Sequence, residues 1–294
     1  MTQDAIIQQF AKIRTWRSGD QRAPHKPLLI LYALGQLQRG EEWLGYDKEE
    51  EKLVQLLAEF GPPRNSYHAY HPFVRLANDG IWRHSEKLDT KVDQSPRSLR
   101  QKHVRGGFTP EVLDALTNDP SLIDRIAVML LDENFPETMH EDILEAVGLE
   151  SEGEYAISRR RKRDPGFRHR ILQAYEYRCA VCGFDVKLNT QVIALEAAHI
   201  KWHQAGGPDT EQNGIAMCTM HHKLFDRGAF TLGGSLEFLV SEAAHGTTGL
   251  EELLLRYHGK EIRPPQSPLY LPSDTYVSWH VREVFKGSAR YQAG

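Results

Sequence analysis

The sequence predicts an α+β protein built from two domains, and three observations support this prediction. The chain has 294 residues, which exceeds the roughly 100–200 residues of one typical domain. Apolar residues recur at helical spacing in the first half, whereas short β-like stretches alternate with loops in the second half. Between the two halves the sign of the charge reverses, and we place a domain boundary there.

The charge reversal consists of an acidic stretch followed by a basic run. Residues 132–154 contain nine Asp and Glu but no Lys or Arg, whereas residues 159–163 are all Arg or Lys. We therefore expect a first domain at residues 1–150, a charged linker at residues 151–164 and a second domain at residues 165–294. The basic run is either a solvated linker or an arm that contacts DNA phosphates. The acidic stretch is a candidate for restraining the second domain by repelling DNA.

Composition and charge exclude several classes of protein. The net charge of −4 excludes a uniformly basic coat as the route to nucleic acid. Three cysteines cannot pair evenly, which argues against a secreted disulfide scaffold. No apolar run approaches the roughly 20 residues that span a bilayer. The beginning of the chain, MTQDAIIQQF, lacks the basic start and apolar core of an export signal. We therefore expect a cytoplasmic protein with no membrane partner.

The first half is expected to be mixed α/β. Apolar spacing predicts helices over residues 6–13, 28–34 and 122–131, and Thr109-Pro110-Glu111 is typical of another helix start. Asp47 with Glu50 resembles a capping box, and Gly61 would end that helix. Within residues 70–82, Asn78-Asp79-Gly80 predicts a hairpin turn between two short strands.

The second half is expected to contain short strands, a short helix and a long tail. Residues 192–195 are β-like, and residues 217–227 are typical of a helix. The loop at residues 205–214 contains three glycines and one proline. Four prolines between residues 264 and 272 predict an extended tail that wraps a surface.

Two short pairs of metal-binding residues lie in this second half, Cys179-Ala-Val-Cys182 and Cys218-Thr-Met-His221. Three thiolates and one imidazole form a tetrahedral Zn²⁺ set, and a two-residue gap lets each pair bind from one tight turn. All three cysteines of the chain belong to this pattern; the alternative is three unrelated buried thiols. Because four protein ligands leave no position for water, we expect this zinc to be structural.

A second set of polar residues, His199, Asn213 and His222, lies around the two pairs. Neighbouring helical residues point about 100° apart, so His221 can face the zinc while His222 faces elsewhere. His222 and Asp226 share a helix face, which suits a harder divalent ion. His199 can act as a base because a pKa of about 6.5 leaves it largely neutral at pH 7. Taken singly, His199 is also compatible with a core residue and Asn213 with an ordinary turn.

The segments CAVC, LEAAHI and GPDTEQNGIAMCTMHHKLFDRGAFTL resemble the HNH endonucleases of the ββα-metal fold, over residues 165–235. The resemblance implies that His199 is the general base and that Asn213 fixes the loop geometry. It also implies that His222 binds the catalytic ion, Mg²⁺ or Mn²⁺. Many relatives carry Asp or His directly before the base, where this chain has Ala198. The remaining candidates for completing the metal shell are Asp226, Glu196 and water.

The segments RAPHKPLLIL, YHPFVRLANDGIW and RGGF of the first half are similar to the sulfur-binding domain of McrA-like, phosphorothioated-DNA-dependent restriction endonucleases. Those enzymes join such a domain to a C-terminal HNH module. Sulfur is a weaker hydrogen-bond acceptor than oxygen, so its burial against apolar atoms is less unfavourable. We therefore expect an apolar notch rimmed by cations, with a second basic cluster on neighbouring phosphates. The expected notch is Tyr70, His71, Pro72 and Phe73; the rim is Arg22, His25, Lys26 and Arg75; the second cluster is Arg100, Lys102, His103 and Arg105.

By resemblance, His71-Pro72 occupies the place of the pair that contacts sulfur, often Tyr-Pro. Together these features predict a type IV, modification-dependent restriction endonuclease that binds phosphorothioated double-stranded DNA and hydrolyses a phosphodiester nearby. One active site cuts one strand, so a homodimer is expected. One alternative is an HNH endonuclease that reads methylated cytosine or unmodified DNA. The alternative from another class is a non-catalytic, zinc-containing DNA-binding protein.

Overall fold

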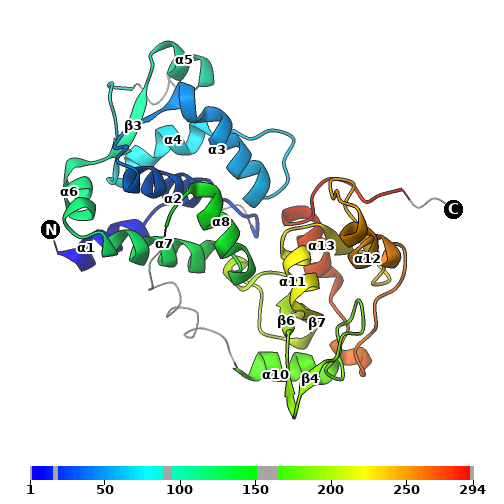
Figure 1. Cartoon of the computed structure of the whole chain (residues 1–294). Helices are drawn as coiled ribbons and strands as arrows, with labels where there is room; N and C mark the ends of the chain where they lie inside the picture. Colours follow the sequence, from blue (N-terminus) through cyan, green and yellow to red (C-terminus); the bar gives the residue numbers. More distant parts are fainter. Residues whose placement is uncertain (1, 16–18, 89–94, 151–164, 292–294) are drawn as a thin grey trace. The chain divides into compact units, whose positions relative to one another are not determined.

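The structure is a computed structural model that describes residues 2–15, 19–88, 95–150 and 165–291. It divides into two compact units, residues 1–161 and 162–294, which we describe separately (Figure 1). The expected linker, residues 151–164, lies outside the described residues together with the basic run, so the domain bounds stay a prediction. Among the described residues, no helix is both long and apolar enough to cross a bilayer.

The first unit is mostly helical and contains one small sheet. Its elements are α1 (Gln3–Ala11), α2 (His25–Gln38), β1 (Leu44–Gly45), α3 (Tyr46–Phe60), α4 (Tyr70–Arg75), η1 (Leu76–Asp79), β2 (Trp82–His84), α5 (Pro96–Gln101), β3 (Arg105–Phe108), α6 (Pro110–Asn118), α7 (Ser121–Asn134), η2 (Glu137–Met139) and α8 (His140–Val147). The helix α2 is central, because residues 27–35 are all buried and it contacts α3, α4, α7 and α8. The antiparallel sheet has the order β1-β3-β2.

The RGGF segment forms β3, and its glycines have a packing role. A Cβ on Gly106 would lie 2.5 Å from the indole of Trp82, and a Cβ on Gly107 would lie 2.5 Å from the Glu42 carbonyl oxygen. Because both distances are shorter than a Cβ atom can approach, any larger residue would force the strand or these neighbours to shift. The two glycines therefore let β3 lie directly against the Trp82 ring and the Glu42 backbone.

The hairpin expected over residues 70–82 is wrong. The segment forms α4, η1 and only the start of β2. Gly80 has a φ of 78° and ends η1 in the left-handed region, so it caps a helix instead of turning a hairpin. Phe73 is fully buried, with ring centroids 5.1 Å from Tyr46 and 5.9 Å from Trp82. Helical spacing brings Phe73 and Leu76 to the core together, and this burial outweighs the β-like composition.

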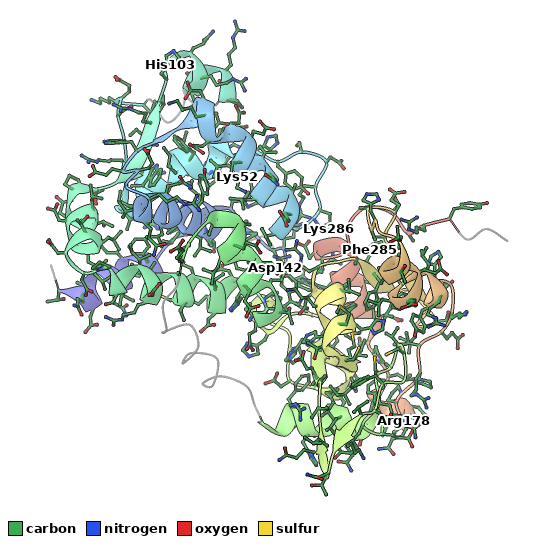
Figure 2. All side chains as sticks on the ribbon, viewed as in Figure 1. Lys52, His103, Asp142, Arg178, Phe285 and Lys286 are labelled. Atoms are coloured by element: carbon green, nitrogen blue, oxygen red, sulfur yellow. The ribbon has the colours of Figure 1, made fainter. Side chains whose placement is uncertain are left out.

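The helices expected in the first half are present as α1, α2, α3, α6 and α7, which confirms those predictions. Thr109 is the N-cap of α6, and Pro110 is its first residue. The capping box at Asp47 is wrong, since the N-cap of α3 is Gly45. The Asp47 carboxylate instead pairs with the exposed His103, 3.0 Å away, which follows α5 (Figure 2).

The second unit is built on an antiparallel hairpin followed by a helix. Its elements are α10 (Pro165–Ala174), β4 (Lys187–Leu188), β5 (Gln191–Val192), β6 (Leu195–His199), η3 (His203–Ala205), η4 (Glu211–Asn213), β7 (Gly214–Cys218), α11 (Thr219–Asp226), β8 (Phe230–Leu232), β9 (Phe238–Val240), α12 (Thr248–Leu253), η5 (Leu255–Tyr257), η6 (Pro268–Tyr270) and α13 (Asp274–Glu283). In the β6–β7 pair, Leu195 lies opposite Cys218 and His199 opposite Gly214. The β6-β7-α11 order is the expected ββα arrangement, and the mixed content confirms the α+β class.

The segment after β9 returns along the whole second unit. Its backbone amides donate to carbonyl oxygens spread along the earlier chain: Arg263 to Ala180, Gln266 to Ala174, Ser273 to Gln212 and Lys286 to Gly228, each at 2.8 to 3.0 Å. Phe285 and Lys286, labelled in Figure 2, follow α13. The proline-containing part is irregular apart from η6, whereas α13 was not predicted; it buries Trp279, whose ring centroid lies 5.8 Å from that of Trp202.

Candidate metal centres and active site

Four candidate ligands come together where the turn after α10 meets the junction of β7 and α11. They are Cys179, Cys182, Cys218 and His221, and their ligand atoms all lie within 4.8 Å of one another. His221 Nδ1 lies 3.1 Å from Cys218 Sγ and 3.8 Å from Cys179 Sγ. The β6–β7 register places Cys218 at the end of the hairpin, so His221 follows it within the first turn of α11. This cluster can hold a metal ion.

The other nitrogen of His221 supports this assignment. His221 Nε2 lies 2.9 Å from the Leu253 carbonyl oxygen. Because a carbonyl oxygen can only accept, Nε2 carries a hydrogen, which leaves Nδ1 facing the thiols as the atom that would bind a metal after losing its proton. Hydrogen bonds from Cys182, Cys218 and His221 lower the pKa of the Cys179 thiol, which favours the thiolate that metals bind. The donor set and its orientation both fit a metal centre.

Asn213 is fully buried and ends η4, directly before β7. Its Oδ1 accepts from the Lys201 amide at 2.8 Å, while its Nδ2 donates to the carbonyl oxygens of Lys201 at 3.0 Å and Pro208 at 2.9 Å. Its own carbonyl accepts from the Ile200 amide at 3.0 Å. The side chain therefore fixes the conformation of the loop that follows His199, which is a structural role.

His199 ends β6 and has three side-chain partners: Phe167, Asp209 and His203, whose ring centroid lies 6.2 Å away. Its ring stacks on Phe167 with centroids 4.2 Å apart, and its Nε2 lies 2.7 Å from Asp209 Oδ1. Burial lowers the pKa of His199, and the Asp209 carboxylate offsets part of that decrease. A neutral imidazole with one nitrogen fixed by a carboxylate can act as a general base.

His222 faces a different environment from its neighbour His221. The His222 ring is buried between two carboxylates, with Nδ1 2.6 Å from Glu196 Oε2 and Nε2 3.2 Å from Asp226 Oδ2. Burial alone would lower the pKa of His222, but Asp226 and Glu196 outweigh it and raise the pKa to about 9. Asp226 also raises the pKa of His199, so it lies within electrostatic reach of both rings. Once the ring releases a proton, one imidazole and two carboxylates would form a donor set suited to a divalent cation.

Sequence reasoning missed Asp209, Phe167 and His203, whose side chains contact His199. Asp209 lies in the glycine-rich loop ten residues after His199, but nothing in the spacing alone tells which loop carboxylate turns inward. Phe167 comes from α10, before the metal-binding pairs. The expected residues His199, Asn213, His222 and Asp226 all lie on or beside the β6-β7-α11 unit.

In the first unit, several residues expected to contact DNA are held in internal contacts. Arg22 is buried and donates to the Phe60 carbonyl oxygen at 2.9 Å. Lys26 Nζ lies 2.5 Å from Asp79 Oδ2 and 2.8 Å from the Arg14 carbonyl oxygen. Phe73 is also buried, so Arg22, Lys26 and Phe73 expose little or no side-chain surface to a ligand. Arg100 pairs with Glu50 at 2.6 Å.

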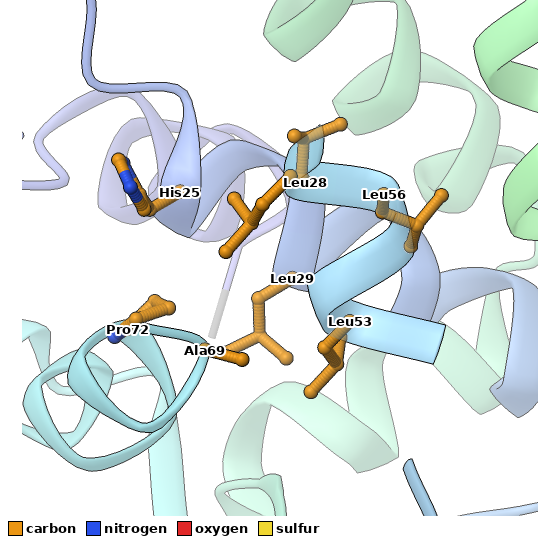
Figure 3. A pocket seen from close by; sticks show the side chains of 8 residues that line it. His25, Leu28, Leu29, Leu53, Leu56, Ala69 and Pro72 are labelled. Carbon is orange, nitrogen blue, oxygen red and sulfur yellow. The ribbon is translucent and has the colours of Figure 1, made fainter. Parts of the chain in front are cut away.

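The Arg100 side chain is nevertheless 51% exposed, and three further expected basic residues are also accessible. Arg75, Lys102 and Arg105 are exposed, and Arg105 lies 5.5 Å from the Trp43 ring centroid. The rings of Tyr70 and His71, both on α4, lie with centroids 4.2 Å apart and are tilted by 40°. Pro72 and His25 line an otherwise aliphatic pocket between α2, α3 and α4 (Figure 3). The other lining residues are Leu28, Leu29, Leu53, Leu56, Leu57 and Ala69.

His25 is the one titratable side chain among these lining residues. Burial, together with the nearby charges of Arg64, His71 and His68, lowers the pKa of His25 to about 4. The ring is therefore neutral at pH 7 and adds little positive charge to the pocket. An apolar cavity with a neutral imidazole at its edge favours a large, weakly hydrogen-bonding atom over a strongly solvated one.

The hairpin-and-helix unit, its four-residue metal cluster and its separate histidine pair define an HNH-type nuclease module, joined in one chain to a mostly helical domain. Known families agree with this class: residues 179–233 match the HNH endonuclease family, and residues 3–152 match the family described as ScoMcrA-like, DNA sulfur-binding domain. Because the second match covers half of the chain, this chain belongs to the ScoMcrA-like DNA sulfur-binding family. The predicted resemblances to both families are thereby confirmed.

Solved structures similar to this chain include two isolated sulfur-binding domains. The sulfur binding domain of SprMcrA complexed with phosphorothioated DNA is 22% identical, with 52% of this chain and 98% of that chain covered and a TM-score of 0.44. The corresponding ScoMcrA domain complex is 20% identical, with 49% and 94% covered and a TM-score of 0.43. The type IV phosphorothioation-dependent restriction endonuclease ScoMcrA is 21% identical, with 49% and 32% covered and a TM-score of 0.41. No curated protein matches the chain.

Proposed function

We propose that this protein is a type IV restriction endonuclease that binds phosphorothioated duplex DNA and hydrolyses a phosphodiester bond nearby. The observation that carries the proposal is the presence, in one chain, of a sulfur-binding-family domain and an HNH domain. Within the HNH domain, His199 and His222 each contact a carboxylate while Asn213 closes the loop that follows His199. The similar solved domains of ScoMcrA and SprMcrA were both captured on phosphorothioated DNA.

In the proposed reaction, His199 removes a proton from water. The resulting hydroxide oxygen forms a bond to phosphorus, and the P–O3′ bond breaks with its electron pair passing to the 3′ oxygen. The 3′ oxygen then takes a proton from solvent water. The products carry 5′-phosphate and 3′-hydroxyl ends, as the HNH resemblance implies. A Mg²⁺ or Mn²⁺ ion held by His222 with Asp226 or Glu196 would offset negative charge on the phosphate and the departing oxygen.

The Cys3His cluster is proposed to hold Zn²⁺ with a structural role. Soft thiolates and imidazole favour zinc over Mg²⁺ or Mn²⁺, which prefer oxygen ligands. Cys179, Cys182, Cys218 and His221 supply all four positions of a tetrahedral site. Since such a site has no open position for water, it would fix the turn and the helix start relative to the hairpin.

For recognition of the modification, we propose that the sulfur atom lies against the aliphatic pocket beside Pro72 and His25. A phosphate oxygen buried there would lose hydrogen bonds to water, whereas sulfur loses less. Arg75, Lys102 and Arg105 are exposed and can contact neighbouring phosphates. Tyr70 and His71 remain candidates for contacts around the sulfur, and Arg100 for a phosphate. We propose structural roles for Arg22, Lys26 and Phe73 because of their internal contacts.

The function is tested by comparing three duplexes of one sequence: phosphorothioated, cytosine-methylated and unmodified. The zinc-loaded protein is incubated with each in the presence of Mg²⁺ or Mn²⁺, beside the variant His199→Ala. We expect cleavage of the phosphorothioated duplex alone, and none by the variant. Equal cleavage of all three would show that the enzyme needs no mark, and preference for the methylated duplex would identify a different mark. Binding without cleavage by the unaltered protein would identify a non-catalytic DNA-binding protein.

A homodimer is proposed because each active site cuts a single strand. Sedimentation of the protein with and without a phosphorothioated duplex tests this, and a 1:1 complex that still cuts both strands would contradict it. A protein that acts on cellular DNA in this way is proposed to be cytoplasmic.

A further inference from the structure

Asp209 is the carboxylate nearest to the proposed base, and neither family assignment gives it a role. Its Oδ1 lies 2.7 Å from His199 Nε2, and both side chains are largely shielded, with exposed fractions of 32% and 23%. Phe167 covers one face of the His199 ring with an interplanar angle of 18°. Stacking limits tilting of the ring, so the contact with Asp209 decides which nitrogen points away from the loop.

The loop that carries Asp209 is tightly built. The Pro208 carbonyl oxygen, one residue before, accepts from Asn213 Nδ2 at 2.9 Å. The Asp209 carbonyl oxygen accepts from Arg170 Nη2 at 2.8 Å. A Cβ on Gly207 would lie 1.8 Å from the Lys201 carbonyl oxygen, so the chain can pass there only as glycine. Backbone contacts on both sides therefore hold the Asp209 carboxylate in its place.

The contact selects one tautomer of the neutral ring. A carboxylate only accepts hydrogen bonds, so His199 Nε2 carries the hydrogen and Nδ1 carries the lone pair. We propose that Asp209 is a positioning residue that makes Nδ1 of His199 the atom that takes the proton from water. The inference rests on the proposed nuclease function. When the proton moves from water to Nδ1, the ring becomes an imidazolium, and the negative carboxylate at Nε2 stabilises it.

Three variants of the same loop separate this role from general support of the fold. Asp209→Asn keeps the size of the side chain, but an amide can donate as well as accept and no longer selects a tautomer. Glu211→Gln makes the same chemical change two residues away, where the carboxylate pairs with Arg170 at 2.9 Å. Glu211 forms no hydrogen bond with His199, but its partner Arg170 also donates to the Asp209 carbonyl oxygen. Glu211→Gln is therefore the control for loosening of the loop with the carboxylate at Nε2 kept. Asp209→Glu keeps the charge and should restore part of the activity.

The first measurement does not depend on cleavage. Nitrogen NMR of the zinc-loaded full chain, without the catalytic divalent ion, reports which nitrogen of His199 is protonated, at a pH where the ring is neutral. We expect the hydrogen on Nε2 in the unaltered protein and in Glu211→Gln, and a mixture of tautomers in Asp209→Asn. A hydrogen on Nδ1 in the unaltered protein would overturn the inference.

The second measurement is cleavage of the phosphorothioated duplex under saturating divalent ion. We expect kcat of Asp209→Asn to fall by about 10²- to 10⁴-fold with KM nearly unchanged, as for other carboxylates that orient a catalytic histidine. A decrease of less than twofold would overturn the inference while leaving the nuclease assignment intact. Activity of Asp209→Asn that returns at higher Mg²⁺ or Mn²⁺ would also overturn it, because Asp209 would then be a metal ligand. If the unaltered protein cuts no duplex, the proposed function itself fails.

Discussion

Replacing Asn213 with alanine tests whether the loop after His199 is held mainly by one buried amide. The side chain makes three hydrogen bonds, two to the backbone of Lys201 and one to Pro208. At about 1 kcal/mol net for each bond, the loss is about 3 kcal/mol, and it rises when the abandoned backbone groups stay away from water. Since about 1.4 kcal/mol corresponds to a factor of ten, opening of the loop should become roughly 100-fold more frequent.

Hydrogen exchange of the zinc-loaded full chain measures this opening directly. The Lys201 amide donates to Asn213 Oδ1, so its exchange should accelerate by roughly 100-fold in Asn213→Ala. Gln212→Ala is the matched control, because Gln212 is the preceding residue and its side chain makes one exposed bond to the Leu269 carbonyl oxygen. It should change exchange by less than about threefold. An Asn213→Ala protein whose Lys201 amide exchanges as slowly as before would refute this reasoning.

Three further predictions concern the metal, a buried histidine and a buried ion pair. Chelation of the metal, or Cys182→Ser, should unfold the second unit and leave the first folded, since structural zinc contributes about 10–16 kcal/mol of apparent binding free energy. Circular dichroism and proteolysis measure this unfolding. A second unit that stays folded without metal would contradict the prediction. The pKa of His25 is lowered to about 4, so the unfolded chain takes up a proton first as pH falls below about 6.5. The free energy of unfolding of the first unit should be highest above that pH and should decrease by up to about 3 kcal/mol toward pH 4. Urea unfolding measures this change, and the variant His25→Asn should lack the pH dependence. Lys26→Ala should destabilise the first unit by about 3–5 kcal/mol, because Asp79 would stay buried without its cation. If the unfolding temperature is unchanged and DNA binding is weakened, Lys26 is instead a DNA-contacting residue.

The second unit follows closely from the sequence because metal chemistry restricts spacing. Two chelating pairs can meet only if the chain between them folds back on itself, and β6 and β7 do so in the register that brings Cys218 toward Cys179 and Cys182. Adjacent helix positions then separate His221 from His222. These relations are local or fixed by ligand geometry, so short motifs are sufficient to predict them.

The misses are side chains whose partners lie far away along the chain. Residues 70–75 have a strand-like composition, yet they form α4 because Phe73 packs against Tyr46 in another helix. Lys26 turns inward because it pairs with Asp79, which is 53 residues away in the sequence. Asp209 turns toward His199 because Asn213 and Arg170 shape its loop. Such choices depend on tertiary packing, which local patterns do not contain.

The returning C-terminal segment limits how this nuclease can be transplanted onto another DNA reader. The matched HNH motif ends at residue 233, yet Arg263 is bonded beside the metal-binding turn, Ser273 beside the loop closed by Asn213 and Lys286 just after α11. A fusion that carried only the motif would leave these backbone carbonyls and the apolar surface under Trp279 open to water. A transferable nuclease domain should therefore span residues 165–290. Chimeras that contain a shorter segment should aggregate, whichever DNA-binding domain is attached to them.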